Sequence, residues 1–189
     1  MSFISKRYVI KIPSEICVIY NKTNDVLLIK TQNKTKMLHL NVKLLILKEK
    51  NYIIVTNQFT NRLSNKIRSS IQGNTVSLIK QTLIDVQVLT HRKLKLVGVG
   101  YKVFEEFTKS GQKLLNFKLG YSHSLFYRIP SKINVNINQS IKLFLSGESL
   151  FNISQCASVI RKCKKPEPYK GKGILYSNEI IQLKEGKKV

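Results

Sequence analysis

The clearest hydrophobic pattern in the chain occurs twice. Residues 12–18 and 129–135 both follow the sequence Ile-Pro-Ser-x-Ile-x-Val, in which apolar residues alternate with others. Alternation with a period of two is typical of a strand with one buried face, and proline is tolerated at the start of a strand. Each copy is followed, after a turn, by another apolar run, at residues 25–29 and 141–145. The pattern therefore predicts a pair of strands in each half of the chain.

Apolar residues at helical spacing follow each pair of strands. Such residues recur every three or four positions along one face of a helix. In the first half they are Val76, Ile79, Leu83 and Val86, with Asn74 or Thr75 as the predicted N-cap. In the second half they are Ile153, Cys156, Ala157 and Ile160, between Gly147 and Pro166. After each helix we predict a strand that contains a Gly-x-Gly or similar stretch, at 94–103 and 170–183.

The order of strands, helix and strand thus occurs twice, which indicates an internal duplication. We predict an α+β fold of two tandem homologous domains, each a mostly antiparallel sheet packed against one main helix. The predicted domains are 1–91, with an insertion around 33–73, and 92–189, with a basic C-terminal extension. Within and around the insertion, the predicted elements are strands at 44–47 and 52–55 and a polar loop with a helical turn at 62–73.

The charge of the chain narrows the range of possible functions further. The 189 residues include 33 Lys and Arg but only 10 Asp and Glu, which gives a formal net charge of +23. Such an excess repels itself unless a polyanion neutralises it, so nucleic acid is the first candidate partner and an anionic membrane the second. No apolar run reaches the ~18 residues needed to span a bilayer, and the cations do not follow one amphipathic helix. These features favour nucleic acid.

The residue types that carry catalysis or bind metals form no recognisable pattern. The three cysteines lack a Cys-x-x-Cys pair and the three histidines are far apart, so we predict no metal and no cofactor. Gly98-Val99-Gly100 lacks the third glycine of a dinucleotide fingerprint and is expected to lie within a continuous strand. Ser122 and His123 are neighbours, and neighbours on a strand point to opposite faces, which argues against a nucleophile–base pair. We therefore predict that the chain is not an enzyme.

The stretch best suited to binding is residues 164–174, Lys-Lys-Pro-Glu-Pro-Tyr-Lys-Gly-Lys-Gly-Ile. Its prolines form a stiff extended turn, its lysines suit phosphates, and Tyr169 offers a ring on which bases or sugars stack. Gly171 and Gly173 are expected to allow close approach of RNA rather than to serve folding. The alternative is an ordinary charged surface loop. The predicted RNA-binding residues are Arg161, Lys164, Lys165, Tyr169, Lys170, Gly171, Lys172, Gly173, Ser122, His123, Lys184, Lys187 and Lys188.

Several motifs occur in an order that resembles one protein family. They are Lys-Leu-Lys-Leu-Val-Gly-Val-Gly-Tyr-Lys at 93–102, Leu-Gly-Tyr-Ser-His at 119–123, Ile129-Pro130, Arg161 and the stretch 166–174. Together they resemble the large-subunit ribosomal protein numbered six in the bacterial scheme, strongly in the C-terminal half and faintly in residues 33–73. The chain departs from that family at Leu175, where a basic residue is usual, and at Ser149-Leu150-Phe151, the start of the second helix.

The resemblance implies two tandem homologous domains and a structural role in the ribosome. The implied role is to bind large-subunit rRNA near the sarcin–ricin loop and the landing region of the translational GTPases, and to stabilise its fold. The implied partners are that rRNA, neighbouring large-subunit ribosomal proteins and, transiently, translational GTPases, with no membrane span. The alternative is a free-standing basic RNA-binding or RNA-chaperone protein, and a basic lipid-binding protein is more distant. Co-sedimentation with ribosomes at moderate salt separates the first two.

The composition also bears on location. The chain is rich in Ile, Lys and Asn, whose codons are rich in A and T, and its divergent first half looks like an organellar version of the family. Residues 1–8 lack the apolar core of a signal peptide, so we expect the chain to be made where it acts. The predicted location is the large subunit of the mitochondrial ribosome, with an organelle-encoded gene. A plastid or the bacterial cytoplasm is the alternative.

Overall fold

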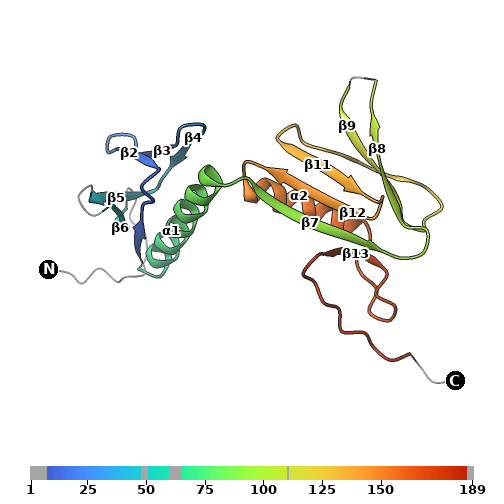
Figure 1. The fold of residues 1–189 in the computed structure, drawn as a ribbon. Helices are drawn as coiled ribbons and strands as arrows, with labels where there is room; N and C mark the ends of the chain where they lie inside the picture. Colours follow the sequence, from blue (N-terminus) through green and yellow to red (C-terminus); the bar gives the residue numbers. More distant parts are fainter. Residues whose placement is uncertain (1–7, 48–50, 60–64, 110, 187–189) are drawn as a thin grey trace. The chain divides into compact units, whose positions relative to one another are not determined.

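The computed structural model describes residues 8–47, 51–59, 65–109 and 111–186. The chain forms two compact units, Met1–Val88 and Leu89–Val189, called unit 1 and unit 2 below (Figure 1). Among the described residues, all strand pairs are antiparallel and each unit contains one α-helix. The α+β fold predicted from the sequence, with antiparallel sheets and one main helix in each half, is confirmed.

Unit 1 contains two three-stranded sheets, with the orders β1-β6-β5 and β2-β3-β4. Its strands are β1 (Val9–Lys11), β2 (Cys17–Asn21), β3 (Val26–Lys30), β4 (Thr35–His39), β5 (Val42–Leu47) and β6 (Tyr52–Phe59). The pair β2 and β3 is the strand pair predicted from the first Ile-Pro-Ser pattern, and β5 and β6 contain the runs predicted around 44–47 and 52–55. The strands β1 and β4 were not predicted, because β1 has only three residues and β4 has few apolar ones.

The helix of unit 1, α1, spans Asn65–Gln87 and buries its predicted apolar face, whose four residues are at most 6% exposed. The predicted N-cap at Asn74 or Thr75 is wrong, because α1 begins at Asn65, within the predicted polar loop. Polar side chains in this part of α1 form hydrogen bonds within unit 1. The Gln72 side-chain amide donates to the carbonyl of Val55 on β6 (2.9 Å), and the Thr75 hydroxyl donates to the carbonyl of Gln72 (2.8 Å). These bonds support a helical stretch that has no continuous apolar stripe.

Unit 2 is built on a four-stranded sheet with the order β11-β12-β7-β13. Its strands are β7 (Thr90–Val97), β11 (Ile133–Asn138), β12 (Lys142–Gly147) and β13 (Gly173–Tyr176). The pair β11 and β12 is the second predicted strand pair. The strand predicted at 170–183 is limited to β13. β7 follows α1, but it pairs with β12 and β13 in unit 2.

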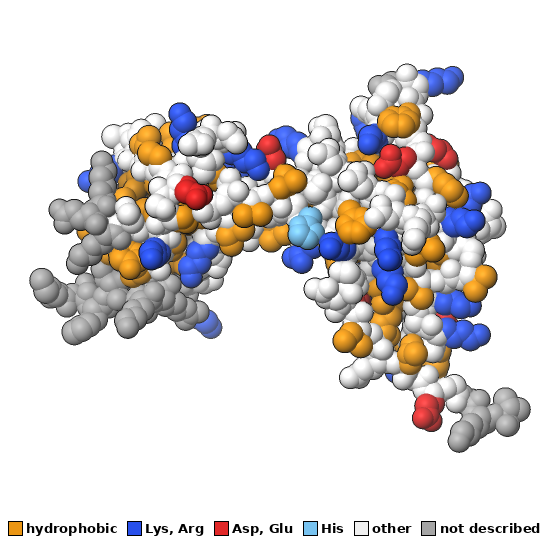
Figure 2. All heavy atoms as spheres, in the orientation of Figure 1, with side chains coloured by type: hydrophobic (Ala, Val, Ile, Leu, Met, Phe, Trp, Pro, Cys, Tyr) orange, Lys and Arg blue, Asp and Glu red, His pale blue; other side chains and the backbone are white. Residues whose placement is uncertain are grey.

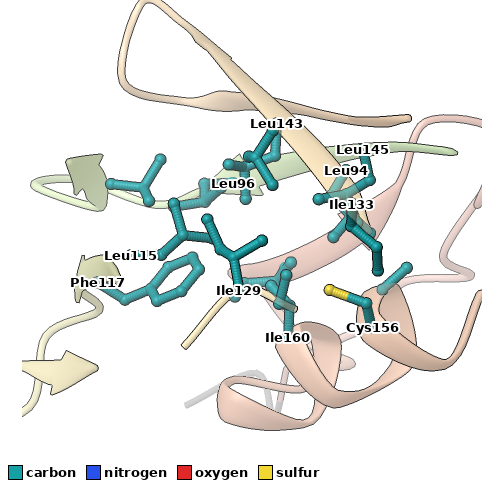
Figure 3. Packing of buried hydrophobic residues seen from close by; sticks show 14 of the residues in the cluster. Leu94, Leu96, Leu115, Phe117, Ile129, Ile133, Leu143, Leu145, Cys156 and Ile160 are labelled. Carbon is teal, nitrogen blue, oxygen red and sulfur yellow. The ribbon is translucent and has the colours of Figure 1, made fainter. Parts of the chain in front are cut away.

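The helix α2 (Leu150–Cys163) covers one face of this sheet, and the residues between them form the core of unit 2 (Figure 3). Its predicted apolar face is confirmed, since the four buried residues of α2 are Ile153, Cys156, Ala157 and Ile160. They share one cluster with inward-facing residues of the sheet, among them Leu94, Leu96, Leu143 and Leu145. At the start of α2, the N-cap residue Ser149 makes no side-chain capping bond.

A second sheet of unit 2 has the order β10-β9-β8 and was not predicted. Its strands are β8 (Lys102–Phe107), β9 (Lys113–Lys118) and β10 (Leu125–Arg128). The buried residues Val103, Leu115 and Phe117 join this sheet to the same core. In β8 and β9 the apolar pattern is irregular, because Glu105-Glu106 and Asn116 interrupt the alternation. That irregularity explains why the strands could not be identified from the pattern.

The stretch Gly98–Tyr101 is a turn between β7 and β8, so the continuous strand predicted at 94–103 is wrong. The Tyr101 N–H donates to the Gly98 carbonyl at 3.4 Å. The Tyr101 ring occupies the space that a side chain on Gly98 or Gly120 would need, since an added Cβ would lie 2.8 Å or 3.2 Å from it. Two glycine motifs, distant in sequence, therefore meet at one tyrosine ring.

Candidate RNA-binding surface

Residues 164–173 form a loop that connects α2 to β13, and its backbone is closed by hydrogen bonds. The Ile174 N–H donates to the carbonyl of Lys164 (2.9 Å), which joins the two ends of the loop. Inside it, the Glu167 N–H donates to the Lys172 carbonyl and the Gly171 N–H to the Glu167 carbonyl, both at 2.9 Å. Together with the fixed φ of its two prolines, these bonds give the loop a defined shape. The basic side chains therefore project from an ordered scaffold.

The two glycines of the loop have structural roles. Gly173 is buried with φ +153°, and a Cβ there would lie 2.6 Å from Cα of Pro166 and 2.8 Å from the carbonyl oxygen of Lys165. Gly171 has φ +68°, a conformation that favours glycine, and an added Cβ would lie 3.5 Å from Leu183. The expectation that these glycines do not serve folding is therefore wrong. Their contact with RNA stays a prediction.

The turn at 119–123 lies beside the start of this loop. The Tyr121 hydroxyl donates to the carbonyl of Cys163 at 3.2 Å, and Nζ of Lys164 lies 4.1 Å from the centroid of the Tyr121 ring. The rings of Tyr121 and His123 are stacked, with centroids 5.9 Å apart. Ser122 and His123 are exposed and lie in a bend rather than on a strand. The structure thus brings His123 and Lys164 to a common surface.

Tyr121 was missing from the predicted residues, although it connects the two segments. Its hydroxyl donates to the carbonyl of Cys163, the last residue of α2. Its ring contacts Lys164 at the start of the loop and His123 in its own turn. Cation–π contacts of this kind are stronger when they are shielded from water. Tyr121 is 43% exposed, so its contact with Lys164 is only partly shielded. An aromatic residue within a glycine-containing turn, at 119–123, was the signal available in the sequence.

The other predicted cations of the loop differ in their exposure. Lys165, Lys170 and Lys184 are exposed, whereas Lys172 is half-buried. Tyr169 is 54% exposed, so much of its ring is open to a ligand. The Lys184 N–H donates to the carbonyl of Pro168 at 2.9 Å, which holds the C-terminal segment against the loop. The remaining predicted cations, Lys187 and Lys188, lie outside the described residues.

Arg161 is held in an intramolecular ion pair. Its Nε donates to Oε2 of Glu179 at 3.0 Å, its Nη2 pairs with Oε1 of the same carboxylate, and Cζ lies 5.7 Å from the centroid of the Tyr176 ring. The Glu179 carboxylate also accepts the Tyr176 N–H at 3.2 Å. The hydrogen bond to Arg161 lowers the pKa of Glu179, and the bond to Glu179 raises the pKa of Arg161. The pair joins α2 to the segment after β13, and its contact with RNA stays a prediction.

This ion pair predicts a pH dependence of stability. Because the folded-state pKa of Glu179 lies below its unfolded value, the carboxylate stabilises unit 2 above the unfolded pKa. The stabilisation is lost as the pH falls through the folded pKa. We expect Glu179→Gln to lower the Tm at neutral pH and to flatten its decline in acid. Thermal unfolding from neutral to acidic pH measures this, with Glu185→Gln, an exposed carboxylate of the same segment, as the control. Parallel curves for both variants would contradict the prediction.

The described part of the chain offers little for other chemistry. Among those residues, no group of three or more His, Cys, Asp or Glu side chains is placed to hold a metal ion. No described helix is both long and apolar enough to cross a bilayer. The exposed groups around residues 121–123 and 164–173 instead include lysine amines, two tyrosine rings and a histidine. Such groups bind anions and aromatic ligands.

Comparison with known proteins identifies the family. The family model described as Ribosomal protein L6 matches residues 97–177. Large ribosomal subunit protein uL6 of Mycoplasma genitalium is 38% identical over 189 residues, covering 99% of this chain and 97% of the relative. Large ribosomal subunit protein uL6m of Reclinomonas americana is 38% identical over 151 residues, covering 79% of each chain. The protein of Malacoplasma penetrans is 43% identical over 117 residues, covering 62% of this chain and 61% of the relative.

The fold and these matches define a ribosomal protein. The chain belongs to the ribosomal protein L6 family. The family model covers the turn at 98–101, the bend at 119–123 and the loop at 164–173, which are the segments that meet in unit 2. Unit 1 lies outside the match of that model, but the Mycoplasma genitalium relative matches nearly the whole chain.

Proposed function

We propose that this protein is a structural constituent of the large ribosomal subunit that binds and stabilises large-subunit rRNA. The observation that carries the proposal is the ordered loop at 164–173, from which exposed lysines and Tyr169 project beside Tyr121 and His123. Lysines bind phosphates, and aromatic rings stack on bases or sugars, without chemistry on the RNA. Binding to the folded form alone stabilises an rRNA fold by mass action.

We place the rRNA site near the sarcin–ricin loop and the landing region of the translational GTPases, which makes those GTPases transient neighbours. Family membership supports the proposal, and one motif that carries the resemblance, 119–123, lies beside the start of the loop that contains another, 166–174. The proposed partners are large-subunit rRNA and adjacent large-subunit ribosomal proteins. The proposed RNA contacts include Arg161, the loop cations and the two glycines. Chemical probing of the rRNA with and without the protein tests the location.

We propose a mitochondrial ribosome as the location, with two tandem homologous domains at 1–91 and 92–189. The uL6m relative supports an organelle, and the bacterial relatives at similar identity support the bacterial alternative equally. Fractionation of native cells, probed for this chain, separates these locations. Recovery with the large subunit of mitochondrial ribosomes is expected. Recovery with cytoplasmic bacterial ribosomes or plastid ribosomes would replace the proposed location and leave the ribosomal role intact.

The loop lysines provide the direct test of RNA binding. Replacing Lys165, Lys170 and Lys184 with glutamine removes three exposed charges. We expect the slope of log affinity against log salt to fall by about 2–3, since each phosphate contact contributes about 0.7–0.9. Filter binding of the full chain to large-subunit rRNA of Mycoplasma genitalium measures this slope. The control replaces three exposed lysines of unit 1, Lys11, Lys22 and Lys30, with glutamine.

Two outcomes would count against the proposed function. Equal slopes for the loop variant and the unit 1 control would remove the loop from the RNA-binding surface. Failure of the native protein to co-sediment with large subunits at moderate salt would favour the free-standing RNA-binding or RNA-chaperone protein. Retention of the wild-type protein and loss of the loop variant from the subunit is the expected result.

A further inference from the structure

The sheet of unit 2 has a second face, which α2 does not cover. Strand alternation places one set of residues of β7, β11 and β12 toward α2 and the other set outward. The outward residues are His91, Lys93 and Lys95 on β7, Lys142, Phe144 and Ser146 on β12, and Asn134, Asn136 and Asn138 on β11. We call this set the lysine–asparagine face. In Figure 2, Lys and Arg side chains lie along β7, whose position is labelled in Figure 1.

The strand register arranges these nine residues in three rows of three. The rows are Asn138–Lys142–Lys95, Asn136–Phe144–Lys93 and Asn134–Ser146–His91. Neighbours within a row are separated by the ~4.8 Å between strands, and successive rows by the ~6.8 Å that two residues span. Apart from Phe144 and Ser146, which are half-buried, every member is exposed. The sheet therefore fixes a periodic array of amide and ammonium groups.

The electrostatics of this face favour an anionic ligand. The three strands β7, β11 and β12 contain no Asp or Glu, so no carboxylate on them neutralises the lysines. Lys142 lies directly opposite Lys95 in the register, an arrangement of like charges that destabilises a sheet. Lys93 lies over the Phe144 ring, with Nζ 5.5 Å from its centroid. A repulsive pair on an open sheet face is relieved when an anion binds between its members.

We propose that the lysine–asparagine face is a second RNA-binding surface, which contacts the sugar–phosphate backbone of a large-subunit rRNA helix. The proposal rests on the proposed function, and it adds a surface that shares no residue with the loop at 164–173. Lysines bind the phosphates, and asparagine amides both donate to phosphate oxygens and bond to 2′-hydroxyls. The Phe144 ring lies beneath Lys93 and does not stack on bases. Recognition at this face therefore depends on RNA shape and little on sequence.

A triple substitution of the full chain tests this face. Lys93, Lys95 and Lys142 are replaced with glutamine, and binding to Mycoplasma genitalium large-subunit rRNA is measured across a range of salt. We expect the slope of log affinity against log salt to fall by about 2–3, compared with little change for the control at Lys11, Lys22 and Lys30. Footprints on the rRNA should lose protection in a segment different from the one affected by the loop variant.

A second variant, Asn134→Asp with Asn136→Asp and Asn138→Asp, keeps the shape of the side chains and adds three negative charges. It should weaken rRNA binding at least tenfold at low salt, which a merely structural role of these exposed residues would not produce. The melting temperature of the lysine variant should equal or exceed that of the wild type, because the repulsion between Lys95 and Lys142 is removed.

The outcomes separate this proposal from the proposed function. If the lysine and asparagine variants bind rRNA like the control while the loop variant is weakened, the second surface is overturned and the function stands. If only the loop variant binds rRNA like the control, the loop is excluded as an RNA-binding surface and the lysine–asparagine face remains one. If the lysine variant loses binding to phosphatidylserine vesicles while its rRNA affinity is unchanged, the face binds lipid and the proposal is overturned. If the face binds an acidic protein while the lysine variant keeps its rRNA affinity, the proposal is overturned as well.

Discussion

Replacing Gly173 with valine should destabilise unit 2 by more than about 3 kcal/mol and lower its Tm by about 10 °C or more. The first Cβ atom would lie 2.6 Å from Cα of Pro166 and 2.8 Å from the carbonyl oxygen of Lys165, distances that real contacts do not reach. Both are backbone atoms of the same loop, so no side chain can rotate away. The φ of +153° adds strain for any residue with a side chain. Thermal unfolding of the full chain, followed by circular dichroism, measures the loss.

Gly186→Val is the matched control, since nothing lies within 4 Å of a Cβ at that position and its backbone has no positive φ. Its Tm should equal that of the wild type. Gly171→Val should have an intermediate effect, because its φ is +68° but its neighbours are at ordinary contact distance. A wild-type Tm for Gly173→Val, with rRNA binding alone weakened, would show that the glycine serves RNA approach and that the loop backbone relaxes around the new side chain.

The helical faces and the main strand pairs were predictable because they bury one apolar side each. In α2, Ile153 and Ile160 are fully buried, and the spacing between the four apolar residues is enough to locate the helix. The pairs β2–β3 and β11–β12 follow from two similar patterns of alternation. In each case one periodic signal persists over several residues. Burial on one face is what a sequence reports most directly.

Elements held by polar contacts across the fold were not predictable. The early start of α1 depends on the bond from Gln72 to a carbonyl of β6, whose position is known only after folding. The end of β7 at Val97 depends on positive φ at Gly98 and Gly100. The sequence of this stretch is also compatible with a continuous strand. The sheet β8-β9-β10 lacks a clean alternation because it carries exposed Phe104 and Phe107 beside glutamates.

The rigidity of the basic loop was predictable, but the pairing of the side chains around it was not. Charge, the two prolines and Tyr169 indicated a rigid basic loop, and the ordered backbone of residues 164–173 agrees with this. The pairing of Arg161 with Glu179, and that of Lys164 with Tyr121, join residues far apart in sequence. Leu175 stands where the family usually has a basic residue, and it is 8% exposed. The chain therefore places an apolar side chain in a buried position here.

Truncation of Ile160 should have a comparably large effect on unit 2. Its side chain is fully buried between α2 and the sheet, in one cluster with Leu94 and Leu145 (Figure 3). Removing three carbons there leaves a cavity in a core that cannot collapse around it, because the facing strands are fixed by their hydrogen bonds. We expect Ile160→Ala to cost about 2–5 kcal/mol and to lower the Tm by about 10 °C or more.

Val159→Ala provides the comparison within the same turn of α2. Val159 is 39% exposed and lies off the buried face, so its truncation should change the free energy of unfolding by less than about 0.5 kcal/mol. Urea unfolding of both variants, with m-values compared to confirm the same change in exposed surface, measures the difference. Equal losses in the two variants would mean that α2 does not pack on the sheet through the Ile153–Ile160 face. Because the loop at 164–173 begins where α2 ends, Ile160→Ala should also weaken rRNA binding near the melting temperature, whereas Val159→Ala should not.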